Sequence, residues 1–390
     1  MEQFNFQNLH CIFYDDNEIL ARRLTSQFDL SFNIKYEPKQ HSFSCSFEYK
    51  TNCFRHETIE KLSRQYQLLT RQLFDNKPMY ELSILLPEDI RIITDLSIAD
   101  VQHQHQQQCI HYLFVDRCQE HPQKLCIVLD EQSLTYSEVL YYVQLLSVYL
   151  IKECYVQPQQ IVCQCVDRSI EMCIGILSIL TCAAVYCPLN QQYPQKRLLS
   201  VIHDMQTQHV LVHQLTKYKF DEINIQEIIY NLKHRCLLDN ELELLSNVKL
   251  TADHIAYVLS TSGTTGQPKF VPICHRNFTS FIQSFSSNLQ IFTSQDNVIQ
   301  IAQCSFDVHF EEIVGALVVG STLVMLHPSG HLDMSYLSSV IQMKQVAFID
   351  TVPTMMMSLC DYMQETIQCE RLKSLRCISV CGKYLNLFVV

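Results

Sequence analysis

Apolar and polar positions alternate in regular blocks along the last third of the chain. Short apolar runs typical of buried strands lie near 255–259, 298–302, 321–326, 345–350 and 375–380. Helical periodicity separates them, near 276–289, 309–319, 334–343 and 354–363. Strands that alternate with helices at this spacing predict a parallel sheet covered by helices. Ligands bind such sheets at the carboxyl ends of strands. We therefore expect an α/β fold with its site at that edge, formed by the 260–269 loop and Asp307.

The interval 134–212 shows a similar alternation and predicts a second α/β layer. It contains an uncharged run of 16 residues, 172–187, that ends at Pro188. A membrane-spanning helix needs about 20 apolar residues. We interpret the run as a buried helix near 170–181 followed by a strand from Val185, with a membrane span as the alternative.

A polar, low-complexity run, VQHQHQQQ, occupies 101–108 and separates two patterned regions. It is typical of a linker, which we prefer to a metal site on its two histidines. The expected organisation is a first domain over 1–100, a linker over 101–108 and a second domain over 109–390.

One loop in the second domain has the parts needed to hold a polyphosphate. The stretch IAYVLSTSGTTGQPK (255–269) follows an apolar strand and contains two of the chain's 7 glycines. Glycines let backbone N–H groups turn toward a ligand, while hydroxyls and Lys269 add donors and charge. The spacing differs from that of the Walker P-loop. The alternative is a flexible polar loop without a ligand.

This loop resembles the phosphate-binding signature of adenylate-forming enzymes, which include acyl-CoA ligases, luciferases and nonribosomal peptide synthetase adenylation domains. The resemblance continues in one register through segments 134–150, 167–198, 298–326 and 375–385. It implies layered helix–parallel sheet–helix subdomains. It also implies that ATP phosphates are bound by Thr261, Ser262, Gly263, Thr264, Thr265, Gly266 and Lys269. The family usually has Gly after this lysine, whereas the chain has Phe270.

The resemblance also implies an amino-acid pocket. Phe306 and Asp307 match the pair that opens this pocket in peptide synthetases, where the aspartate holds the α-ammonium ion of the substrate. Val308 and Glu311 are further expected substrate-binding residues, and a glutamate there would favour a cationic or hydrogen-bonding side chain. Two alternatives stay open: Asp307 is only a helix cap, or Glu311 and Glu312 are solvated.

The segment 26–78 resembles the last part of a condensation domain, which precedes the adenylation domain in peptide synthetases. We therefore expect residues 1–100 to form an α+β condensation-domain remnant. The condensation motif His-His-x-x-x-Asp-Gly does not occur in the sequence, so we expect no condensation chemistry.

The implied reaction joins an amino acid to ATP with Mg²⁺, releases pyrophosphate, and passes the aminoacyl group to a phosphopantetheine thiol on a separate carrier protein. The family's adenine-stacking segment, ribose-binding Asp and catalytic Lys find no match in this chain, and its Gly-Gly-Glu segment appears as Cys381-Gly382-Lys383. We therefore expect a truncated unit that is inactive alone and has no catalytic residue. The alternatives are a non-catalytic scaffold remnant and an acyl-CoA-ligase-like fragment.

Composition narrows the remaining possibilities. The net charge of −11 and the absence of a basic stripe exclude a general nucleic-acid binder. The 19 cysteines sit within apolar runs and no signal peptide opens the chain, which predicts free thiols and a cytoplasmic protein. The spacing Cys163-x-Cys165 fits one face of a strand rather than a zinc site, so we expect no metal site. Because the run 172–187 is interpreted as a buried helix and strand, we also expect no membrane partner.

Overall fold

The structure is a computed structural model that describes residues 10–14, 29–37, 42–51, 53–73, 78–102, 108–220, 226–229, 237–261, 269–288 and 290–381. The chain divides into two compact units, Met1–Gln106 and Gln107–Val390, and each is described by itself. The division falls inside the run 101–108.

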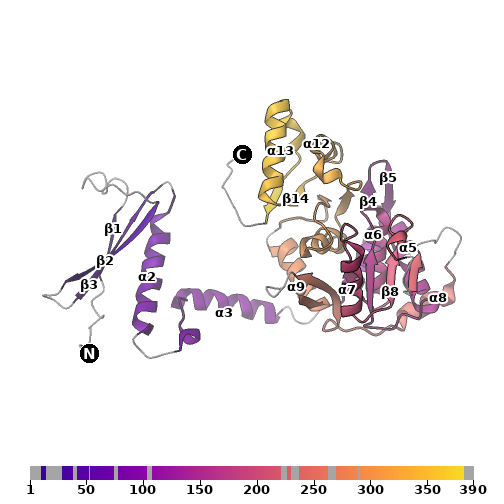
Figure 1. Cartoon of the computed structure of the whole chain (residues 1–390), viewed down its shortest axis with the longest axis horizontal. Coiled ribbons are helices and arrows are strands. Elements are labelled where there is room, and N and C mark those ends of the chain that lie inside the picture. The colour runs from indigo at the N-terminus through magenta and orange to yellow at the C-terminus, as the bar shows by residue number, and fades with distance from the viewer. Residues whose placement is uncertain are drawn as a thin grey trace. The chain divides into compact units, whose positions relative to one another are not determined.

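The first unit combines a three-stranded sheet with two long helices (Figure 1). The strands are β1 (His10–Tyr14), β2 (Leu30–Glu37) and β3 (Ser42–Tyr49), and the helices are α2 (His56–Leu73) and α3 (Pro87–Gln102). The central strand β3 pairs in parallel with β1 and antiparallel with β2. Ile59 of α2 is fully buried against Phe47 and Tyr49 of β3, so α2 covers one face of the sheet.

The second unit contains twelve strands that form two six-stranded sheets in its described part. One sheet has the order β11-β10-β7-β6-β8-β9 and the other β15-β14-β12-β13-β4-β5. The strands are β4 (Leu125–Leu129), β5 (Gln132–Thr135), β6 (Ile161–Cys165), β7 (Val185–Pro188), β8 (His209–Val212), β9 (Gln226–Ile229), β10 (Ile255–Thr261), β11 (Lys269–Cys274), β12 (Asn297–Ile299), β13 (Thr322–Met325), β14 (Phe348–Thr351) and β15 (Cys377–Val380).

Helices cover both sheets and fill the space between them. They are α4 (Ile110–Glu120), α5 (Tyr136–Lys152), α6 (Ile170–Thr181), α7 (Gln195–Asp204), α8 (Asp239–Ser246), α9 (His275–Gln283), α10 (Asp307–Phe310), α11 (Ala316–Val319), α12 (Met334–Met343) and α13 (Pro353–Thr366). The largest core cluster joins residues of both sheets through α4, α5, α6 and α11. Smaller clusters lie on the outer faces, one under α12 and α13 and one under α7. This is the predicted layering of helices and parallel sheets, and the prediction is confirmed.

The run 172–187 is part of the central core. It forms helix α6 and strand β7, as the sequence predicts, and nearly all of its side chains are buried. In the part of the chain that the structure describes, no helix is long and apolar enough to cross a membrane. The cysteines in the described part of the chain are free thiols, and most of them are buried.

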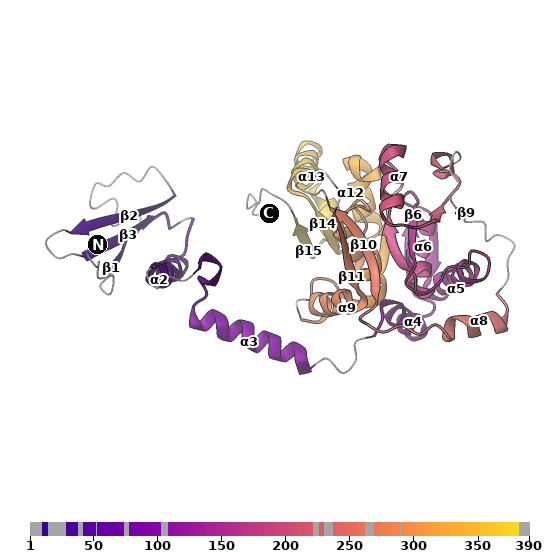
Figure 2. The same ribbon diagram turned by 60° about the horizontal axis from the view of Figure 1, so that its bottom comes forward.

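The sheet membership of the later strands differs from the prediction. Strand β10 pairs with β7 in the first sheet, whereas β12, β13, β14 and β15 lie in the second. An additional strand, β11, follows the loop and pairs antiparallel with β10, as Figure 2 shows. The expectation of one parallel sheet after residue 250 is therefore wrong. Hydrophobic periodicity identifies a strand but carries no information on which sheet it joins.

Candidate functional site

The β10–β11 hairpin fixes both ends of the expected phosphate-binding loop. Thr261 and Lys269 are opposite each other in the hairpin, and the Thr261 hydroxyl donates to the Lys269 carbonyl oxygen at 3.2 Å. Both side chains are exposed. Ser262, Gly263, Thr264, Thr265 and Gly266 lie outside the described residues. Phe270 packs against the outer core cluster of this sheet, which accounts for a bulky residue next to Lys269.

The expected substrate residues begin a helical run of three parts. Helix α10 starts at Asp307, a π-helical turn covers Glu311–Gly315, and α11 continues the run. Such π turns inside helices occur frequently at functional sites. Phe306 occupies the N-cap position, and Asp307 is the first helical residue. The Asp307 carboxylate is exposed and accepts from the neighbouring Val308 N–H at 3.0 Å, so it does not form the usual cap to the second or third residue.

Aromatic packing holds this helix start against β10. The Phe310 ring is stacked on Tyr257 at a centroid distance of 4.0 Å and meets Phe278 edge to face at 4.9 Å. Phe310 is 1% exposed and Tyr257 is 6% exposed. Because Phe310 is fixed on the sheet, Asp307 and Glu311 are brought close to Tyr257. Burial is the largest cause that raises the pKa of the Tyr257 phenol, and the charges of Asp307 and Glu311 raise it further.

The carboxyl groups of Asp307, Glu311 and Asp350 lie close enough to repel one another. Asp350, at the carboxyl end of β14, is 4% exposed and accepts from the Ser379 hydroxyl at 2.9 Å. Burial, then Asp350, then Asp307 raise the pKa of Glu311 to about 8. Within the described parts of the chain, Glu311 Oε1 is buried without a hydrogen-bond partner. Burial and Asp307 also raise the pKa of Asp350. A cation placed here would relieve this repulsion.

Glu312 belongs to a buried hydrogen-bond network, so the alternative in which it is solvated is wrong. Its carboxyl group is 0% exposed and accepts from the N–H groups of Ile301 at 3.0 Å and Ala302 at 2.9 Å, and from Gln300 Nε2 at 3.0 Å. Burial raises the pKa of Glu312 to about 8, while these donors act in the opposite direction.

Arg168 links this network to the other sheet. It follows β6, and its Nε donates to Gln300 Oε1 at 2.9 Å. Its Nη2 donates to the Ile301 carbonyl oxygen. Together Arg168 and Glu312 fix the backbone of residues 300–302, which leads to Phe306 and Asp307. Arg168, Gln300 and Asp350 were not identified from the sequence. The sequence signal that could have identified these three residues is that each is a polar residue at or just after the end of an apolar strand.

No metal centre is found among the residues that the structure describes, where no three His, Cys, Asp or Glu side chains are grouped to hold a cation.

Comparisons with known proteins identify the family. The AMP-binding enzyme family matches residues 114–389. Gramicidin S synthase 2 of Brevibacillus brevis is 27% identical over 344 residues, 87% of this chain and 8% of the synthase. Malpinin synthetase of Mortierella alpina is 30% identical over 308 residues, 77% of this chain and 4% of that synthetase. The chain thus spans a small fraction of these curated relatives.

Solved structures share the fold. The N-terminal subdomain of NpsA from Klebsiella oxytoca, in complex with 3-hydroxybenzoyl-AMSN, has a TM-score of 0.57 at 23% identity, covering 72% of this chain and 68% of that one. The nonribosomal peptide synthetase FmoA3, in a form with α-methyl-L-serine-AMP bound, has a TM-score of 0.67 at 17% identity, covering 92% of this chain and 40% of that one. The chain belongs to the AMP-binding enzyme family and has the fold of the adenylation domains of nonribosomal peptide synthetases.

Proposed function

We propose that the second unit is an amino-acid adenylation unit, which uses ATP to form an aminoacyl-AMP and pyrophosphate. The observation that carries the proposal is the position of Asp307. Its carboxylate is exposed at the start of a helix that Phe310 fixes against β10, the strand that leads into the Thr/Gly-rich loop. An ammonium ion bound by Asp307 would therefore lie beside β10, the strand that leads to the loop where the phosphates are proposed to bind.

The loop supplies the groups that neutralise the phosphates. Two anions must meet in adenylation, so donors and positive charge must face the reacting oxygens. Thr261 and Lys269, at the two ends of the hairpin, are proposed to act with Ser262, Gly263, Thr264, Thr265 and Gly266 of the connecting loop. Mg²⁺ is proposed to arrive with ATP, because this ion is usually held largely by substrate phosphates and water.

The carboxyl cluster favours a particular substrate class. Phe306, Asp307, Val308 and Glu311 are the proposed substrate-binding residues, and Asp350 joins them. One carboxylate can hold the α-ammonium ion, while Glu311 and Asp350 can accept from a second amino group. We therefore propose an amino acid with a cationic or hydrogen-bond-donating side chain.

The remaining parts of the proposal concern the neighbouring machinery. The aminoacyl group would pass to a phosphopantetheine thiol on a separate carrier protein, in the cytoplasm. Residues 1–100 would be the end of a condensation domain, and 109–390 would carry the adenylation function. The likeness to FmoA3 supports this arrangement because it covers more of the chain than the second unit alone.

Binding of aminoacyl sulfamoyl adenosines, stable mimics of aminoacyl-AMP, tests the proposal by calorimetry on the full chain. We expect the ornithyl and lysyl analogues to bind more tightly than the leucyl one. The des-amino analogue should bind at least tenfold more weakly, since a hydrogen bond to a charged group contributes about 1.5–3 kcal/mol. Asp307→Asn should remove this difference, whereas Asp361→Asn, at an exposed aspartate of α13, should preserve it.

Two results would contradict the proposal. If no analogue binds to the folded chain, the scaffold alternative is favoured. If amino and des-amino analogues bind equally, the acyl-CoA-ligase-like alternative is favoured. Amino-acid-dependent exchange of pyrophosphate into ATP, measured over a panel of amino acids, tests turnover separately from affinity, and the expected result for this chain alone is no exchange.

A further inference from the structure

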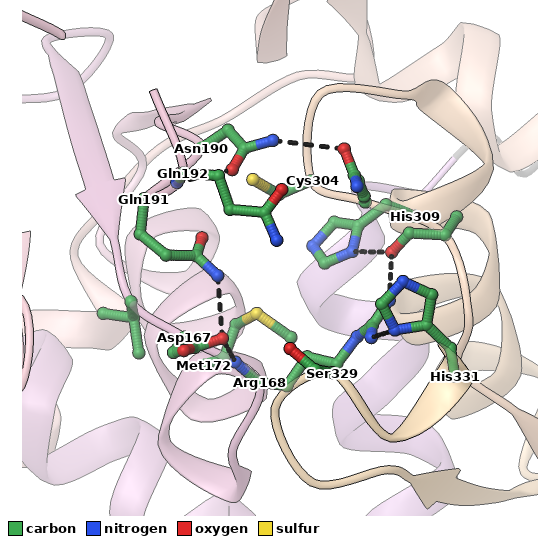
Figure 3. Close-up of a pocket in the computed structure, with 13 residues that line it drawn as sticks. Asp167, Arg168, Met172, Asn190, Gln191, Gln192, Cys304, His309, Ser329 and His331 are labelled. Atoms are coloured by element: carbon green, nitrogen blue, oxygen red, sulfur yellow. Dashed lines mark hydrogen bonds between the residues drawn. The ribbon is translucent and has the colours of Figure 1, made fainter. Parts of the chain in front are cut away.

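A cavity of about 240 Å³ lies in the second unit, at the carboxyl ends of strands from both sheets (Figure 3). It is formed by the segments that follow β6, β7, β12 and β13. His309 lines it, although Asp307 and Glu311 do not. The cavity is therefore distinct from the carboxyl cluster of the proposed substrate site.

The cavity receives a buried nitrogen that has no partner among the residues that the structure describes. His309 is 2% exposed, and its Nε2 makes no hydrogen bond. Figure 3 shows this side of the ring directed into the cavity, while the other nitrogen faces the protein. A buried polar atom without a partner is destabilising, so a ligand or water that pairs with it would be stabilised.

The surrounding bonds determine what His309 offers. Its Nδ1 lies 3.3 Å from Gln300 Nε2 and 3.4 Å from the Ala302 carbonyl oxygen. Gln300 Nε2 has two hydrogens, and they are donated to the Ala302 carbonyl oxygen and to Glu312 Oε2. The proton of His309 is therefore on Nδ1, which donates to the Ala302 carbonyl oxygen. Nε2 then presents a lone pair, and the cavity has a hydrogen-bond acceptor at its buried side.

The charges around the cavity do not favour an anion. The Arg168 guanidinium is committed to Gln300, to the Ile301 and Ala302 carbonyl oxygens, and to His331 Nδ1. Asp167 at the wall is negative and opposes the Arg168 charge. Burial and Arg168 lower the pKa values of His309 and His331 to about 4, so both rings are neutral at neutral pH.

Carboxamides make up much of the remaining wall. Asn190, Gln191, Gln192 and Gln303 all line the cavity. Asn190 donates to Gln303 at 3.3 Å, and Gln191 donates to Asp167 at 2.7 Å. Each carboxamide carries both a donor and an acceptor, so this wall can pair with a ligand that does the same.

We propose that this cavity binds a small uncharged molecule that carries a carboxamide, whose N–H donates to His309 Nε2 and whose carbonyl oxygen accepts from the amide-lined wall. A carboxylate of the same shape has no N–H for His309 and is repelled by Asp167. The site is thus selective for the amide over the acid.

Nicotinamide and nicotinate form a matched pair of probes for calorimetry at pH 7.5 with the full chain. We expect nicotinamide to bind and nicotinate to bind at least tenfold more weakly. His309→Phe keeps a ring but removes the acceptor, and it should weaken nicotinamide binding about tenfold, as expected at the upper end for one neutral hydrogen bond. His111→Phe is the matched control, because His111 is also buried with an unpartnered nitrogen but does not line the cavity.

Nitrogen NMR of histidine-labelled protein provides a readout that does not depend on a variant. Nicotinamide should shift the His309 Nε2 resonance, assigned by its loss in His309→Phe, and leave the others in place. The proposal is overturned if nicotinamide does not bind at millimolar concentration, which would indicate a cavity filled by water alone. It is equally overturned if nicotinate binds as well as nicotinamide, or if a folded His309→Phe protein binds nicotinamide unchanged.

Discussion

The buried carboxyl group of Glu312 should make the stability of the protein decrease as the pH rises from about 4.5 to about 8. Burial raises its pKa to about 8 in the folded state, against an ordinary value of 4.5. A carboxyl group whose pKa is raised by folding contributes fully below its unfolded pKa, and this contribution is lost as the pH rises through the folded pKa. Glu312→Gln keeps the shape and a hydrogen-bonding group at this position but removes the titration.

The size of the effect follows from the shift. Each pH unit between the two pKa values changes the free energy of unfolding by about 1.4 kcal/mol for one group. Below pH 6.5 the buried histidines titrate, and His309 shares Gln300 with Glu312, so the comparison is made from pH 6.5 to 8. Over this window the wild type should lose about 2 kcal/mol more than Glu312→Gln. Glu311 and Asp350 titrate in the same direction, but they are present in both proteins and cancel in the comparison.

Urea unfolding followed by circular dichroism at a series of pH values measures this difference. The chain has no Trp and 19 Cys, so tryptophan fluorescence is not an option and a reductant must be present. Glu365→Gln, at an exposed glutamate of α13, is the matched control and should keep the wild-type slope. If Glu312→Gln and wild type show parallel pH dependence from 6.5 to 8, Glu312 is ionised in the folded protein and the three donors outweigh its burial.

Three further predictions concern stability. Burial lowers the pKa of His111 to about 3 and that of His275 to about 4, so stability should be lost as the pH falls from 6.5 to 4. In urea unfolding at acid pH, His111→Phe should reduce this loss by about 1.4 kcal/mol per pH unit. An unchanged pH dependence of stability would contradict the prediction. Phe310→Ala should cost about 3–5 kcal/mol in urea unfolding because it empties a fully buried site, and a cost below about 1 kcal/mol would show that the site collapses. Thr135→Ala removes the capping box of α5 and should cost about 0.5–2 kcal/mol, with Ser133→Ala, two residues earlier, as a near-neutral control.

The elements of the second unit were largely predictable from the sequence because their periodicity is strong. Helix α12 occupies the predicted range 334–343, and the uncharged run 172–187 divides into α6 and β7 as expected. Strand β11 was missed because it is an edge strand in which every side chain is exposed or half-buried, so its pattern lacks a buried face.

The site was only partly predictable, for a different physical reason. Asp307 is in a recognisable motif, but Asp350 and Arg168 acquire their roles from residues distant in sequence. Asp350 meets Glu311 because β14 and the α10 segment end at the same edge, and Arg168 meets Gln300 across two sheets. Pairing between sheets is a property of the fold, which local periodicity does not encode.

The helical run from Asp307 explains how one short segment can serve two separate sites. Successive residues of a helix point about 100° apart, so Asp307 and Glu311, four apart, lie on one face, while His309 is directed elsewhere. Phe310 anchors the run on Tyr257, and Glu312 ties it to residues 300–302. Because Gln300 contacts both His309 and Glu312, a ligand at His309 would rest on the same network that positions Asp307. The two proposed sites should therefore be coupled, and saturating nicotinamide should change the affinity for an aminoacyl sulfamoyl adenosine. By thermodynamic reciprocity, the analogue must change the affinity for nicotinamide by the same factor. Equal affinities with and without nicotinamide would show that the network holds the segment rigid in both states.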